Sequence, residues 1–193
     1  LAAIKPGFIR FPGGCIVEGI SLENRYRWKR TVGELKDRKY IPNLWAFDDD
    51  RSKIGWDVKR PDSHYGQSFG IGFYEYFLLC ELLGAKALPV LSIGTACQFR
   101  STQLVTSVQD ALDLIEFANG PVNSKWGALR AKMGHPESFG LDMISVGNEQ
   151  WESQYVDLYK RHQIFEKAIH EKYPDMRILG TAGPFLDSPI TED

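Results

Sequence analysis

The chain has 193 residues, 43% of them hydrophobic and 25% charged, with 23 Lys and Arg against 25 Asp and Glu and a net charge of −2. This composition is typical of a globular protein and excludes a disordered or fibrous chain. No basic stripe is available to neutralise a run of phosphates, so nucleic acid is not an expected partner. No run of about 18 apolar residues occurs, so no membrane span is expected.

The first residues and the cysteines say little about cellular location. The chain starts with Leu1 in place of Met and shows no signal-peptide pattern, so we expect it to be part of a longer protein. Cys15, Cys80 and Cys97 are too few and too widely spaced for a disulfide framework or a zinc ribbon. The compartment stays open, and a periplasmic or extracellular location is compatible with these features.

Four short runs are predicted to form buried strands, because they are almost continuously apolar and lack the alternation of a half-exposed strand. These runs are residues 8–14, 87–94, 143–148 and 176–183. The first of them contains a charged residue, Arg10, which is expected to have a polar partner because Arg is rarely buried unpaired. That partner is either a structural carboxylate or a catalytic one.

Three helices are predicted between or after these strands. Residues 73–83 are apolar and are followed by Gly84, a typical C-terminal cap. Residues 107–119 place apolar side chains at i, i+3 and i+4 spacing, and residues 154–172 form the third helix, which ends before Pro174. Strands alternating with helices predict parallel crossovers, and hence a (β/α) barrel or an open doubly wound sheet.

The polar residues at the strand ends favour the barrel. Cys15, Asn148 and Glu149 each fall where a strand ends, and the carboxyl ends of the strands build the active site of a TIM barrel. No Gly-x-Gly-x-x-Gly follows the first strand, so a dinucleotide cofactor is not expected. The four histidines show no convergent ligand spacing, so no metal is expected either.

A long excursion, at about residues 15–72, follows the first strand and exceeds what a helix and two short loops need. It is rich in aromatic side chains, including Trp28, Trp45 and Trp56, mixed with polar residues. Such side chains either bind sugar rings or form a small satellite core, and both interpretations stay open. Trp28 and Gln67 are the candidate substrate contacts in this excursion.

Asn148 and Glu149 carry the chemistry that a retaining glycoside hydrolase requires. One carboxyl group protonates the leaving oxygen and later activates water, while a second attacks the anomeric carbon. Glu149 at a strand end suits the first role, and the Asn148 amide could bind the neighbouring sugar hydroxyl. The alternative for Glu149 is a surface carboxylate paired with a cation. Trp151, two residues further on, is a third candidate substrate contact.

Four linked motifs resemble glycoside hydrolase family 51 in order and spacing, over essentially the whole chain. They are FIRFPGGCIVEG at 8–19, RWKRTVG at 27–33, WGALRAKMG at 126–134 and GNE at 147–149. The resemblance implies an α/β fold, an incomplete (β/α)8 TIM barrel comprising about strands two to five. It also implies that the remaining barrel and a β-sandwich domain are absent from residues 1–193.

The resemblance further implies an α-L-arabinofuranosidase that acts by retention without a metal or cofactor. Glu149 would be its acid/base, and Asn148, Arg10 and Cys15 would contact the substrate. The nucleophile would be a Glu after strand seven, outside this chain, so we assign that role to none of the glutamates present and expect the chain alone to be inactive.

The expected partner is an arabinofuranosyl-containing carbohydrate, from which the enzyme releases terminal residues. Self-association of the intact enzyme is left open. Two alternatives stand beside this interpretation. One is a non-catalytic carbohydrate-binding barrel that has lost its nucleophile. The other is a different retaining family that shares the Asn-Glu pair at its fourth strand.

Overall fold

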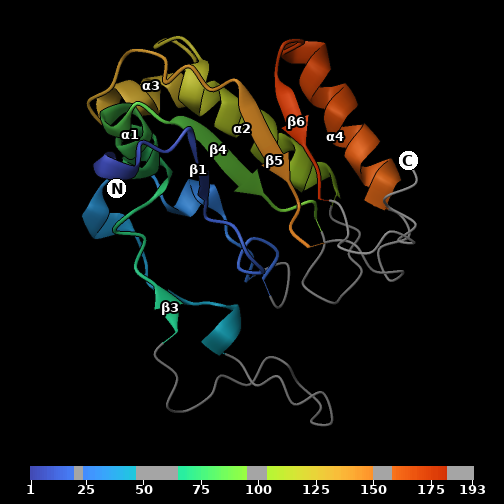
Figure 1. The fold of residues 1–193 in the computed structure, drawn as a ribbon, viewed down its shortest axis with the longest axis horizontal. Helices are drawn as coiled ribbons and strands as arrows, with labels where there is room; N and C mark the ends of the chain where they lie inside the picture. The colour runs from blue at the N-terminus through green and yellow to red at the C-terminus, as the bar shows by residue number, and fades with distance from the viewer. Residues whose placement is uncertain (20–23, 47–64, 95–103, 150–157, 182–193) are drawn as a thin grey trace.

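The computed structural model describes residues 1–19, 24–46, 65–94, 104–149 and 158–181. Its helices and strands follow one another along the chain as shown in Figure 1. The elements are η1 (Ala2–Ile4), β1 (Phe8–Phe11), η2 (Trp28–Arg30), η3 (Leu35–Asp37), β2 (Ile41–Pro42), η4 (Leu44–Ala46), β3 (Gly66–Gln67), α1 (Phe73–Leu83), β4 (Lys86–Leu91), α2 (Leu104–Asn119), α3 (Lys125–Lys132), β5 (Met143–Val146), α4 (Leu158–Lys172) and β6 (Arg177–Leu179).

The four strands predicted from apolar runs form one parallel sheet in the order β1-β4-β5-β6. Each strand therefore lies beside the next one in this series, as repeated βα crossovers require. β1 is shorter than predicted, because Pro12 has no N–H to donate and Gly13 and Gly14 turn the backbone to φ 70° and 67°. The prediction of a parallel α/β fold is confirmed.

The helices begin and end where local chemistry satisfies their backbone. At the start of α1, the N–H of Phe73 donates to the Thr31 hydroxyl at 3.0 Å, and the N–H of Gly72 donates to Glu75 at 2.8 Å. The helix ends at Gly84, which adopts φ 65°. Its bounds match the prediction, and α2 begins three residues earlier than predicted. Residues 154–157, the predicted start of α4, lie outside the described part.

One helix, α3, was not predicted. Its N-cap is Ser124, whose hydroxyl accepts the N–H of Gly127 at 3.1 Å. Gly127 is required there, because a Cβ at this position would collide with the backbone oxygen of Pro121. The buried Arg130 then joins α3 to its surroundings by donating to four backbone oxygens, those of His135, Phe117, Gly120 and Pro136.

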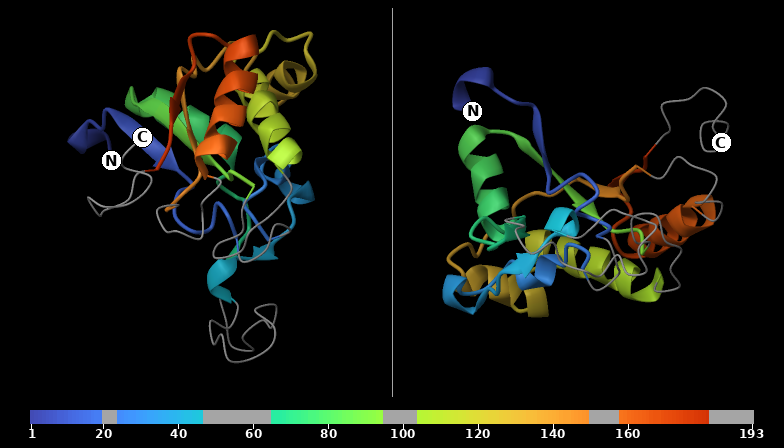
Figure 2. Two further views of the ribbon diagram at one scale, coloured as in Figure 1. Left: turned by 90° about the vertical axis from the view of Figure 1, so that its right-hand side faces the viewer. Right: turned by 90° about the horizontal axis from the view of Figure 1, so that it is seen from below.

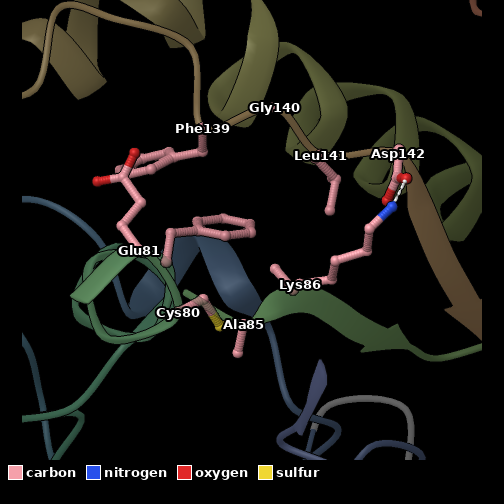
Figure 3. Close-up of a pocket in the computed structure, with 10 residues that line it drawn as sticks. Cys80, Glu81, Ala85, Lys86, Phe139, Gly140, Leu141 and Asp142 are labelled. Atoms are coloured by element: carbon pink, nitrogen blue, oxygen red, sulfur yellow. Dashed lines mark hydrogen bonds and ion pairs between the residues drawn. The ribbon is translucent and has the colours of Figure 1, made fainter. Parts of the chain in front are cut away.

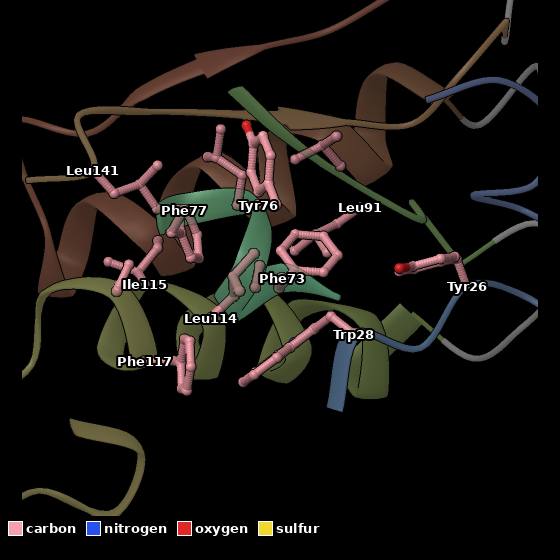
Figure 4. Packing of buried hydrophobic residues seen from close by; sticks show 14 of the residues in the cluster. Tyr26, Trp28, Phe73, Tyr76, Phe77, Leu91, Leu114, Ile115, Phe117 and Leu141 are labelled. Carbon is pink, nitrogen blue, oxygen red and sulfur yellow. The ribbon is translucent and has the colours of Figure 1, made fainter. Parts of the chain in front are cut away.

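The helices α1, α2 and α4 lie on the same side of the sheet (Figure 2). The core between them and the strands is strongly aromatic, as Figure 4 shows, with Phe73 in contact with the rings of Phe11, Tyr26 and Trp28. Ile144 and Val146 of β5 enter the same cluster. Burial of this apolar surface is the main force that holds the helices on the sheet.

The helices α1, α2 and α4 leave the other face of the sheet uncovered at β1 among the described residues (Figure 2), and this determines where Arg10 lies. Ile9 and Phe11 pack against the core. Because side chains alternate along a strand, Phe8 and Arg10 point to the opposite face, where both are exposed. Arg10 therefore lies on the face of the sheet opposite the helices α1, α2 and α4.

Residues 12–72 separate β1 from α1, and some of their described aromatic side chains are buried while others are exposed. Tyr26, Trp28 and Phe69 belong to the main core, whereas Tyr40 and Trp45 are exposed. Within this segment β2 and β3 form an antiparallel pair, which extends away from the four-stranded sheet in Figure 1. Trp56 lies outside the described residues.

Candidate active site

The exit of β5 presents Asn148 and Glu149. All four residues of β5 are buried, and the Gly147 N–H donates to the Leu91 oxygen at 2.7 Å, which joins this exit to that of β4. Gly147 and Glu149 both have positive φ, 86° and 56°. This turn places Asn148 in a buried position, 7% exposed, and Glu149 in an exposed one.

Arg10 reaches the β5 exit from β1. Its Nη2 donates to Oδ1 of Asn148 at 2.7 Å. The sequence anticipated a carboxylate partner for Arg10, and the structure instead gives it an amide oxygen. Gly13 makes room for this contact, because a Cβ on Gly13 would overlap with the Arg10 guanidinium. A hydrogen bond from a charged donor is stronger than a neutral one and fixes the direction of the amide.

Cys15 contacts Glu149 from the loop after β1. The Cys15 thiol donates to Oε2 of Glu149 at 3.2 Å. Cys15 lies in a short turn of the backbone, in which the N–H of Val17 donates to the Gly14 oxygen and the N–H of Gly19 donates to the Cys15 oxygen. The structure therefore brings together Arg10, Cys15, Asn148 and Glu149, although Arg10 and Asn148 are 138 residues apart in the sequence.

This group of side chains is suited to proton transfer next to a bound polar molecule. Glu149 is a carboxyl group open to solvent with one weak donor beside it. Because Arg10 occupies Oδ1 of Asn148, the Nδ2 of that amide faces the other way, and Nδ2 is buried without a hydrogen-bond partner among the described residues. A buried donor without a partner is costly, so a ligand acceptor such as a hydroxyl oxygen would satisfy it.

Glu18 belongs to the same region, although no role at the site was predicted for it. Its carboxylate is 2% exposed and accepts hydrogen bonds from the Ser92 hydroxyl at 2.6 Å and the Ile93 N–H at 3.1 Å. Its position three residues after Cys15, in a motif that follows a strand, was the available signal. A buried carboxylate with both oxygens bonded is not an available nucleophile, and neither is Glu75, which is paired with Arg38.

The remaining candidate substrate contacts, Trp28, Gln67 and Trp151, lie in different environments or outside the described residues. Trp28 is 1% exposed, its ring packs against Trp126 and Phe117, and its Nε1 donates to the Asp110 oxygen. It is a core residue, which corrects the prediction that it contacts substrate. Gln67 pairs with Ile41 in the β2–β3 ladder and lines a hollow beside Phe11 and Pro12. Trp151 lies outside the described residues.

A second pocket, of about 130 Å³, lies at the opposite end of the sheet (Figure 3). Cys80, Phe139 and Leu141 line it, and an ion pair between Lys86 and Asp142 lies at its edge. These residues precede or begin β4 and β5, whereas Asn148 and Glu149 follow β5. In barrel folds, residues at the amino-terminal ends of the strands generally contribute to stability, whereas the carboxyl ends carry the active site. We therefore place the candidate active site at the strand exits.

The described residues hold no group of three or more His, Cys, Asp or Glu side chains that could bind a metal ion. Within the same residues, no helix has the length and apolarity needed to cross a membrane.

Known proteins resemble this chain over nearly its whole length. Residues 1–191 match the α-L-arabinofuranosidase 1 domain. The extracellular exo-α-L-arabinofuranosidase of Streptomyces chartreusis is 40% identical over 201 residues, which cover 95% of this chain and 22% of the relative. The α-L-arabinofuranosidase 1 of Arabidopsis thaliana is 38% identical over 197 residues, which cover 98% of this chain and 26% of the relative. The chain thus spans about a quarter of the length of these curated relatives.

Two solved arabinofuranosidase structures also superpose on this chain. The arabinose-bound MgGH51 α-L-arabinofuranosidase superposes with a TM-score of 0.78 at 31% identity, covering 98% of this chain and 28% of that one. The Thermotoga maritima α-L-arabinofuranosidase in its arabinose complex shares the fold, with a TM-score of 0.69 at 21% identity, covering 93% of this chain and 32% of that one. This chain therefore belongs to the α-L-arabinofuranosidase 1 domain family, within glycoside hydrolase family 51.

Proposed function

We propose that the protein containing this chain is a retaining α-L-arabinofuranosidase, with Glu149 as its acid/base. The observation that carries the proposal is the contact of Arg10, within β1, and Cys15, in the loop after β1, with Asn148 and Glu149 at the exit of β5. The names of the relatives support the substrate, a terminal non-reducing arabinofuranosyl residue on a polysaccharide or oligosaccharide. The arabinose held by two of the structural neighbours supports the same sugar.

We also propose that β1, β4, β5 and β6 are strands two to five of a (β/α)8 barrel. The parallel order of the sheet and the helices on one face support this assignment. The excursion at about 15–72 is then the loop region after the second barrel strand. The other barrel strands, the attacking carboxylate and a β-sandwich domain belong to the remainder of the enzyme.

In the first step, the protonated Glu149 gives its proton to the oxygen of the departing alcohol while the attacking carboxylate forms a bond to the anomeric carbon. In the second step, the Glu149 carboxylate removes a proton from water, which displaces the enzyme from the sugar. The amide of Asn148, held at Oδ1 by Arg10, would donate from Nδ2 to a hydroxyl of the bound sugar. Gln67 and Trp151 remain proposed substrate contacts.

The test uses the full-length protein with Glu149→Ala and two substrates. An arabino-oligosaccharide has a poor leaving group that needs protonation, whereas an activated aryl α-L-arabinofuranoside needs little acid help. We expect a loss of about 10²–10⁴-fold in kcat on the oligosaccharide and a smaller loss in the glycosylation step on the aryl substrate. Azide, which attacks without a base, should restore turnover of the aryl substrate. Small and equal losses on both substrates would refute the assignment.

A further inference from the structure

Glu18 is a buried carboxylate that connects two loops of the site. Its Oε2 accepts the Ser92 hydroxyl hydrogen at 2.6 Å, and its Oε1 accepts the Ile93 N–H at 3.1 Å. Ser92 and Ile93 follow directly after β4, and both are buried. Placing a carboxylate in such a position is unfavourable unless each oxygen is bonded, and here both are.

The turn that carries Glu18 also carries Cys15. The N–H of Val17 donates to the Gly14 oxygen at 3.1 Å, and the N–H of Gly19 donates to the Cys15 oxygen at 2.9 Å. These bonds close residues 14–19 into one unit, so a constraint on Glu18 is transmitted to Cys15. The Cys15 thiol in turn contacts Oε2 of Glu149.

The β4 exit provides a fixed point for this turn. Ser92 donates to Glu18 and also accepts the Gly94 N–H at 3.0 Å, so its hydroxyl is held from two sides. The backbone just before it is tied to the β5 exit, because the Gly147 N–H donates to the Leu91 oxygen at 2.7 Å. Glu18 thus joins the loop after β1 to the exit of β4, which neighbours β5, the strand that precedes Asn148 and Glu149.

We infer that Glu18 is a positioning residue, which holds the turn of residues 14–19 against the β4 exit so that Cys15 meets the Glu149 carboxylate. The inference rests on the proposed role of Glu149. Glu18 itself does not touch the reacting atoms, because it is buried and engaged by the β4 exit. Its removal should change the placement of the acid/base group, not the binding of the sugar.

The first experiment compares Glu18→Ala with Glu18→Gln in the full-length protein. Gln keeps the shape of the side chain, and its oxygen can accept the Ile93 N–H while its NH2 donates to the Ser92 oxygen. We expect Glu18→Ala to lower kcat on an arabino-oligosaccharide by about 10- to 100-fold, since small misplacement of a catalytic group has effects of this order. The loss on an activated aryl arabinofuranoside should be smaller, KM should change little, and Glu18→Gln should recover most of the activity.

Two further variants separate positioning from a general loss of structure. Ser92→Ala removes only the hydroxyl that donates to Glu18, so it should lower kcat by a smaller factor than Glu18→Ala does. Glu171→Ala, at an exposed carboxylate on α4, should leave both substrates unaffected. If Glu18 acts through Cys15, the double variant Glu18→Ala/Cys15→Ala should lose no more activity than the worse single variant, because residues that act through one contact are not additive.

The inference is overturned if Glu18→Ala lowers kcat equally on both substrates, or if its loss adds to that of Cys15→Ala. It is also overturned if Glu18→Gln is as impaired as Glu18→Ala. If Glu149→Ala loses more kcat on the oligosaccharide than on the aryl substrate but Glu18→Ala does not, only the positioning role of Glu18 is wrong. When Glu149→Ala itself lacks that dependence, the proposed function and the positioning role are both wrong.

Discussion

Gly13 and Gly14 are adjacent and have nearly the same backbone, but only one of them is crowded by the site. Their φ values are 70° and 67°. A Cβ on Gly13 would overlap with Nη1 of Arg10, whereas a Cβ on Gly14 would meet no described atom within 4 Å. The variants Gly13→Ala and Gly14→Ala therefore share the backbone cost and differ in their effect on Arg10.

The backbone cost can be worked out first. A left-handed conformation costs an alanine about 1–2 kcal/mol. Replacing glycine also lowers the entropy of the unfolded chain, which offsets about 0.4–1 kcal/mol. We therefore expect both variants to lose about 1 kcal/mol of stability. The flexible guanidinium can move away from the new Cβ of Gly13→Ala, so no large extra loss of stability is expected.

The activity should separate the two variants. Movement of Arg10 breaks its 2.7 Å hydrogen bond to Asn148, and a bond with a charged donor contributes about 1.5–3 kcal/mol. If this bond orients the amide in the transition state, kcat/KM of Gly13→Ala falls by about 10- to 150-fold relative to Gly14→Ala. The assay is hydrolysis of an aryl α-L-arabinofuranoside by the full-length protein, together with thermal unfolding. Equal kcat/KM values for the two variants would refute the role of the Arg10–Asn148 bond.

Three further predictions concern stability and are checked by the unfolding midpoint of the full-length protein. Burial acts to raise the pKa of Glu75, but the hydrogen bonds from Arg38, the Gly72 N–H and the positive charge of Arg38 together outweigh it and lower the pKa from 4.5. The stabilisation is therefore complete above about pH 4.5 and is lost as the pH falls through the folded-state pKa. Arg38→Met should cost about 1.5–3 kcal/mol and weaken this acid sensitivity, because the Gly72 N–H still lowers the pKa of Glu75; an unchanged acid profile would contradict it. Burial lowers the pKa of His162 below 6.5, so stability should decline as the pH falls from about 6.5, and His162→Gln should flatten that decline. Phe73→Ala should cost about 3–5 kcal/mol, because Phe73 is 0% exposed, while Leu82→Ala on the same helix, at 82% exposure, should have little effect.

The periodic elements could be predicted from the sequence because burial alone determines their pattern. The apolar run at 143–148 and the Gly84 stop after α1 both correspond to observed features. The helix α3 was missed because its start depends on Ser124 and on a close approach at Gly127, and neither produces an apolar period. Local contacts of this kind depend on residues brought together by the fold.

The candidate site could be predicted in part. The position of Asn148 and Glu149 at a strand exit could be predicted, because the apolar run before them is visible in the sequence. The partner of Arg10 could not, since charge alone suggested a carboxylate and the structure supplies the Asn148 amide. Composition also could not separate the buried Trp28 from the exposed Trp45, because both lie in one aromatic segment. Which aromatic side chain faces solvent is decided by packing against α2 and α3.

The positive φ of Glu149 has a consequence for engineering this protein. A left-handed backbone costs a non-glycine residue about 1–2 kcal/mol, and glycine or asparagine adopts it at much lower cost. A library selected only for heat resistance should therefore be enriched in Gly or Asn at position 149, with the proposed acid/base carboxylate lost. Under the proposed function, selection for thermostability opposes turnover at this single backbone position, and any such screen needs a simultaneous measure of product release.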